Sequence, residues 1–110
     1  MAAAKFHAEM NEMLELVSRA LPPAEIERVR FGIDVVASNA ALLRTVAARF
    51  RKRAAPLVAA PEFKIDAELL RATVYSDRTL QVDFAKVTPE LTADVRACML
   101  RMLQTAEALK

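Results

Sequence analysis

A single histidine and a single cysteine are the residues of this 110-residue sequence best suited to nucleophilic or metal chemistry. A zinc site needs three or four such ligands, and a disulfide needs two cysteines, so this composition excludes most zinc sites and any intrachain disulfide. His7 has no Ser or Cys close by in the sequence to activate, and we expect it to pack or to lie at the surface. Cys98 has apolar neighbours at helical spacing, which raise the pKa of a thiol, and we expect a core role.

The acidic pairs Asp66/Glu68 and Asp77/Asp83 are close in sequence only, and solvated helix or loop faces account for them. The motifs G-x-S-x-G, H-x-x-E and C-x-x-C do not occur, and the lone Gly32 excludes glycine-rich phosphate loops, which need several residues without Cβ. The sequence therefore predicts a protein that is not an enzyme and that needs no metal or cofactor.

Length and composition predict one domain spanning 1–110. Hydrophobic residues make up 55% of the chain, which is too apolar for disorder, and twenty-two alanines against one glycine favour helices. No apolar run approaches the roughly 20 residues that span a bilayer, and charges occupy the start where a signal peptide is apolar. We expect a cytoplasmic protein with no membrane partner. Alanine and arginine in excess of glycine and lysine hint at a bacterial source.

Two terminal helices are predicted from apolar periodicity. In residues 3–20, Phe6, Met10, Met13, Val17 and Ala20 follow steps of four and three, and Leu21-Pro22-Pro23 ends the pattern. In residues 89–109, Thr88-Pro89-Glu90 supplies an N-cap, a first-turn proline and an early carboxylate. Each helix carries two methionines on its apolar side, which suggests that the two helices pack together.

The strongest pattern is an eight-residue apolar stripe in a long helix predicted over 24–53. Its members alternate steps of three and four: Ile26, Val29, Ile33, Val36, Ala40, Leu43, Ala47 and Phe50. Such a helix would be about 45 Å long, which exceeds the roughly 30 Å diameter of a small domain. We therefore expect the stripe to form an oligomer or partner interface, most simply in a twofold homodimer. Gly32 beside the stripe is expected to mark a close helix crossing.

A basic patch follows the stripe, and no acidic residue separates Asp34 from Glu62. The patch comprises Arg44, Arg49, Arg51, Lys52 and Arg53. One interpretation is helix C-terminal charge that complements the macrodipole. A second is selection of an acidic partner helix, and a third is contact with nucleic-acid phosphates. The small net charge of +2 and the missing helix-turn-helix signals argue against nucleic acid.

The middle of the chain is predicted to contain a linker over 54–61 and a short β-hairpin within 62–87. With Ser76-Asp77-Arg78 as its loop, a hairpin over about 69–84 pairs Ala72 with Val82 and Leu70 with Phe84 on one side. Residues 67–72 are good helix formers, so an all-α bundle is the alternative. The predicted fold is thus mainly α: a helical hairpin with one long striped helix, a short β-hairpin and a C-terminal helix.

The segment Leu21-Pro22-Pro23-Ala24-Glu25-Ile26-Glu27, preceded by Arg19 and followed by a long striped helix, resembles the TraM-type quorum-sensing antiactivators of conjugative plasmids. The resemblance covers about a quarter of the chain, and the 63–87 stretch departs from the family pattern. It implies a small, helical, oligomeric protein that silences a LuxR-type transcription factor by binding it.

Together these features predict a small helical protein that oligomerises and regulates or binds another protein through its long helix. A nucleoid-type DNA-binding protein that uses the basic patch is one alternative. A secretion or assembly chaperone is another, although such chaperones are usually acidic.

Overall fold

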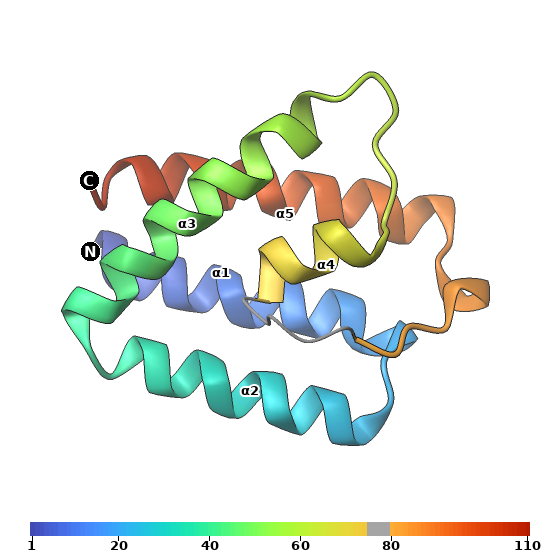
Figure 1. The fold of residues 1–110 in the computed structure, drawn as a ribbon, viewed down its shortest axis with the longest axis horizontal. Coiled ribbons are helices and arrows are strands. Elements are labelled where there is room, and N and C mark those ends of the chain that lie inside the picture. Colours follow the sequence, from blue (N-terminus) through green and yellow to red (C-terminus); the bar gives the residue numbers. More distant parts are fainter. Residues whose placement is uncertain (75–79) are drawn as a thin grey trace.

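A computed structural model describes residues 1–74 and 80–110, and within these ranges the fold is mainly α with no strand (Figure 1). The helices are α1 (Ala2–Val17), α2 (Pro23–Ala37), α3 (Ala40–Ala59), α4 (Ala67–Val74) and α5 (Pro89–Glu107). Two short 3-10 helices, η1 (Ser18–Ala20) and η2 (Phe84–Lys86), follow α1 and precede α5. The all-α alternative is therefore the correct description of the described residues.

Helices α1 and α5 form the centre of the bundle and run in opposite directions (Figure 1). Helix α2 packs against α1, and α3 packs against α5, α4 and the end of α2. The short helix α4 fits between α1 and α3. The predicted terminal helices are confirmed, and at α5 the side chain of Thr88 accepts a hydrogen bond from the Leu91 amide at 3.1 Å.

The core is filled mainly by α1, α3 and α5. Met10 and Met13 of α1 and Met99 and Met102 of α5 are all buried, so the predicted packing of the two methionine-bearing helices is confirmed. The rings of Phe6 and Phe50 meet edge to face with centroids 6.0 Å apart, a favoured aromatic arrangement. Phe50 thereby joins α3 directly to α1.

The single long helix predicted over 24–53 is wrong, because the chain bends by 118° between α2 and α3. Asn39 adopts an extended conformation, and its side-chain oxygen accepts a hydrogen bond from the Leu42 amide at 3.0 Å. Asn is among the strongest N-cap residues, since this hydrogen bond satisfies an amide that a new helix leaves without a backbone partner. The stripe spacing continues across the bend because both helices pack on the same core.

The linker predicted over 54–61 is also wrong for most of its length, because α3 continues to Ala59 with Pro56 inside it. A proline in a helix interior removes one hydrogen bond and normally ends the helix. Here Pro56 lies in the last turn, and Ala54 and Val58 on either side of it are buried. Their burial stabilises the continued helix.

The β-hairpin is wrong where the structure describes it. Residues Ala67–Val74 form α4, which begins where the Asp66 side chain accepts a hydrogen bond from the Leu69 amide at 2.9 Å. The proposed partners Leu70 and Phe84 differ in burial, since Leu70 is buried and Phe84 is 53% exposed. The proposed loop Ser76-Asp77-Arg78 lies outside the described residues. Helix propensity and an N-cap therefore prevailed over an alternating pattern.

Candidate functional site

The eight-residue stripe lies mostly inside the chain's own core. Val29, Ile33, Leu43, Ala47 and Phe50 are each at most 7% exposed. Ile26 and Val36 are partly buried against the same core, and Ala40 is exposed. The stripe therefore packs against α1 and α5 of the same molecule. Helices α2 and α3 are 15 and 20 residues long, so the single long helix whose length indicated an oligomer does not form.

The basic patch divides into two groups. Arg51 is partly buried, and its guanidinium donates a hydrogen bond to the carbonyl oxygen of Ala106 at the end of α5, at 2.6 Å. Its charge thus complements the C-terminus of α5 rather than that of its own helix. Arg53 is also partly buried, whereas Arg44, Arg49 and Lys52 are exposed on α3. These last three form no ion pair with the part of the chain that the structure describes.

A cluster of polar groups joins α1 to α5 around Cys98. The thiol lies 3.3 Å from a carboxylate oxygen of Glu12, and the same oxygen accepts a hydrogen bond from Arg101. Burial raises the pKa of Cys98 to about 12, and the hydrogen bond to Glu12 adds to this effect. Arg101 lowers the pKa of Glu12 by the same contact. A thiol with this pKa stays protonated at neutral pH and is not a nucleophile, so the expected core role is confirmed.

His7 has a packing role at the α1–α2 contact. Its Nε2 lies 3.2 Å from the Asn11 amide nitrogen and 3.6 Å from a carboxylate oxygen of Asp34. Neither neighbour is a nucleophile that the imidazole would activate. The acidic pair Asp66/Glu68 is likewise structural, because Asp66 caps α4 and Glu68 lies 3.9 Å from Arg71.

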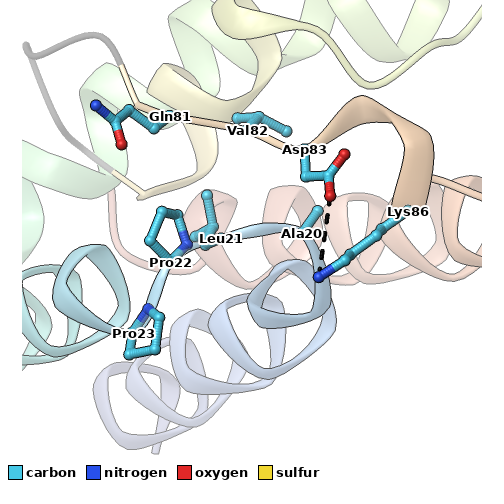
Figure 2. A pocket seen from close by; sticks show the side chains of 8 residues that line it. All are labelled: Ala20, Leu21, Pro22, Pro23, Gln81, Val82, Asp83 and Lys86. Atoms are coloured by element: carbon cyan, nitrogen blue, oxygen red, sulfur yellow. Dashed lines mark ion pairs between the residues drawn. The ribbon is translucent and has the colours of Figure 1, made fainter.

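An open groove of about 610 Å³ lies between the α1–α2 turn and residues 81–86 (Figure 2). Figure 2 shows Pro22 and Pro23 on one side and Val82, Asp83 and Lys86 on the other. The two charged side chains that line it pair with each other at 3.9 Å. The amide of Asp83 donates a hydrogen bond to the Ala20 carbonyl, which ties the walls together. Among the described residues that line it there is no histidine, cysteine or serine.

Exposed apolar side chains gather on the outward side of α2. Phe31 is 71% exposed, and Val35, one helical turn later, is 44% exposed. We call this surface the α2 outer face; it comprises Ala24, Glu27, Arg28, Phe31, Asp34 and Val35, all of which are exposed. No atom of a packed neighbour lies within 4 Å of the position that a Gly32 Cβ would take, so no described helix of this chain makes the predicted close crossing at Gly32.

A second surface hollow of about 280 Å³ lies between α3 and α5. We call it the α3–α5 groove; it is lined by Arg51, Ala55, Leu103, Gln104 and Glu107. Among the residues described, no group of three or more His, Cys, Asp or Glu side chains is placed to hold a metal ion. No single described helix is long and apolar enough to cross a membrane; α2 and α3 meet the length and hydropathy criteria only as a bent pair.

The chain matches no protein-family model, no curated protein and no solved structure. The assignment of function therefore depends on the surfaces described above.

Sequence reasoning missed Phe31 because it lies off the apolar stripe. The available signal was its position next to the sole glycine, among the charged residues Arg28, Arg30 and Asp34. A large aromatic residue on the polar side of an amphipathic helix has no place in the core and points to solvent or to a partner. The Glu12–Cys98–Arg101 cluster had no such signal, because its members are distant in sequence.

Proposed function

We propose that this chain is a non-catalytic regulatory protein that binds another protein through the α2 outer face. The observation that carries the proposal is the exposure of Phe31 with Val35 beside it. Helix α2 packs against α1 and α3 on its other side. Asp34 borders α1 at the edge of the α2 outer face, 3.6 Å from Nε2 of His7, whereas Phe31 and Val35 stay exposed within the described residues.

The composition of the α2 outer face is typical of a protein interface. Single exposed apolar residues are common, but aromatic residues are enriched at the centres of interfaces, where a few of them dominate affinity. Phe31 lies at the centre of the face, with Glu27, Arg28 and Asp34 as a polar rim. Burial of a phenylalanine side chain contributes about 1.5–3 kcal/mol, which is enough to decide whether a partner stays bound.

The resemblance to TraM-type antiactivators also favours α2 as the binding helix, and it suggests the class of the partner protein. The Leu21-Pro22-Pro23 break that carries the resemblance leads directly into α2. A LuxR-type transcription factor is the partner that the resemblance implies. Silencing by binding requires no catalytic group in this chain, in keeping with the unreactive Cys98 and the structural role of His7.

Affinity capture with a matched pair of variants tests the proposal. Immobilised wild-type protein and Phe31→Ser are exposed to a lysate of the source organism, and the captured partner is then titrated by calorimetry. Phe84→Ser serves as control, because Phe84 is also exposed but lies on η2. We expect the wild type and Phe84→Ser to bind one protein equally, and Phe31→Ser to bind it at least tenfold more weakly.

The proposal is wrong if Phe31→Ser binds as tightly as the wild type. It is also wrong if Phe84→Ser loses binding to the same degree, because affinity would then depend on another surface. Circular dichroism of each variant establishes that the helices are intact. A captured transcription factor of the LuxR type would support the resemblance, and any other partner would contradict it.

A further inference from the structure

The α3–α5 groove and the exposed cations beside it form a second surface, independent of the α2 outer face. Ala55 and Leu103 give the groove an apolar floor. Leu100, one turn earlier on α5, is 39% exposed and extends the apolar surface along that helix. An apolar floor of this kind fits aliphatic side chains of a partner.

Arg44, Arg49 and Lys52 of α3 carry charge that no described acidic side chain compensates. On α2, Arg28 pairs with Glu25 at 2.7 Å and Arg30 pairs with Glu27 at 2.8 Å. Helix α3 has no acidic residue to serve in the same way, and Arg44, Arg49 and Lys52 remain exposed without an ion pair in the described residues. A surface with cations of this kind complements an anionic partner and repels a cationic one.

The exposed side of α3 has room for a whole helix of a partner and not only for one of its side chains. Arg44 and Lys52 lie one turn before and one turn after Ala48 on the same side of α3, and Ala55 follows one turn beyond. Ala41, Ala48 and Ala55 recur every seven residues and are all exposed. Such small side chains let a second helix approach to the short end of the 8–10 Å range of helix separations.

We infer that the α3–α5 groove is a docking site for an acidic amphipathic helix of a partner protein. Leucine-like side chains of that helix fill the space over Ala55 and Leu103, and its carboxylates pair with Arg44 and Lys52. A nucleic acid fits less well, because its sugar-phosphate backbone has no leucine-like side chain to fill the space over Ala55 and Leu103. The Glu107 carboxylate on the rim is paired with Lys110 at 2.7 Å.

Titration with a defined peptide tests the inference. The probe is a 21-residue helical peptide with Leu at heptad positions a and d, Glu at e and g, and Ala elsewhere. Its counterpart carries Lys in place of Glu. We expect the Glu peptide to shift amide resonances of ¹⁵N-labelled protein around Ala48, Ala55 and Leu103, and the Lys peptide to cause no shift. Binding should weaken as salt increases, because exposed charges are screened.

Charge-reversal variants locate the site. Arg44→Glu with Lys52→Glu should weaken binding of the Glu peptide at least tenfold. Arg19→Glu with Lys64→Glu changes net charge equally at exposed positions outside α3 and α5, and should leave the affinity within twofold. Phe31→Ser should also leave it unchanged, which separates this inference from the proposed function.

Three results would overturn the inference. The first is no binding of the Glu peptide, or binding no tighter than that of the Lys peptide. The second is equal weakening by the two charge-reversal pairs, which would indicate attraction by net charge alone. The third is tighter binding of a 20-base-pair DNA duplex than of the Glu peptide in the same buffer, which would assign these cations to a nucleic acid.

Discussion

The guanidinium of Arg51 donates a hydrogen bond to the carbonyl oxygen of Ala106, 2.6 Å away, and so fixes the end of α5 to the middle of α3. The last carbonyls of a helix lack intrahelical donors and carry the negative end of its dipole. The Ala106 carbonyl also accepts a hydrogen bond from the Leu109 amide at 3.0 Å, and Arg51 adds a charged donor to it. This contact closes one end of the bundle and forms a wall of the α3–α5 groove.

Arg51→Met is expected to lower the free energy of unfolding by about 1.5–3 kcal/mol, because hydrogen bonds to charged groups contribute about that much. Urea denaturation followed by circular dichroism measures the change. Lys52→Met is the matched control, since Lys52 is exposed and its loss should change stability by less than about 0.5 kcal/mol. Equal losses in the two variants would contradict the role given to Arg51.

Asn39→Ala is expected to cost about 1 kcal/mol of stability, because it removes the side-chain acceptor for the Leu42 amide. Asn39→Asp keeps an acceptor at the N-cap and should retain most of the stability. Thermal unfolding of the three proteins side by side checks this. If the alanine variant were as stable as the wild type, the bend would owe its stability to core packing alone.

Gly32→Ala is expected to stabilise the protein by roughly 0.5–1 kcal/mol, since alanine is the better helix former and no packed neighbour stands within 4 Å of the new methyl group. For a domain of this size the melting temperature should rise by about 2–4 °C. Differential scanning calorimetry gives the value directly. A lower melting temperature would mean that the α2 outer face is already occupied, for instance by a second copy.

Cys98 makes stability depend on pH in the alkaline range. Folding raises the pKa of its thiol from an ordinary 9.0 to about 12, so the folded state holds the proton more tightly than the unfolded state. The resulting stabilisation is complete below pH 9 and is lost as the pH rises toward 12. Relative to Cys98→Ala, the wild type should lose up to about 1.4 kcal/mol for each pH unit in this window. Parallel curves of stability against pH for the two proteins would refute the shift.

Phe50→Ala is expected to cost about 3–5 kcal/mol, as for other large-to-small core substitutions. Because Phe50 packs on Phe6 of the same chain, the loss should not depend on protein concentration. Chemical unfolding at two concentrations a hundredfold apart measures this. A loss that shrinks at high concentration would place Phe50 at an interface between copies, as the stripe alone suggested.

Local signals in the sequence were sufficient for the two terminal helices. Thr88 and Pro89 mark the start of α5, and the Leu21-Pro22 break ends the first helical segment, because caps and prolines act within one turn. Five of the eight stripe residues of α2 and α3 are buried in the core, and Ala40 is exposed. The sequence did not reveal what the stripe packs against, since spacing along a helix does not specify whether a neighbouring helix belongs to the same chain.

Two of the errors, the single long helix and the β-hairpin, share one cause, which is competition between a pattern and a cap. Asn39 and Asp66 each accept an amide hydrogen bond at a helix start, and both were visible in the sequence. The eight-residue stripe predicted a continuous helix in spite of the N-cap signal of Asn39. The alternating apolar pattern predicted a hairpin in spite of the N-cap signal of Asp66. The contacts of Arg51 and of Glu12 with α5 depend on residues 55 and 89 positions away, so they could not be predicted from local sequence.

The corner at Asn39 also determines which side of α3 faces the core when α2 is in place. Each residue added to or removed from a helix rotates everything beyond it by about 100°. The apolar spacing runs from Val36 to Leu43 across the corner without a change of step, so the number of residues in the corner is as constrained as their chemistry. Only Ser38 and Asn39 join α2 to α3, so deleting Ser38 would leave too short a corner for the Phe50 side of α3 to stay on α1, although every remaining residue would be unchanged.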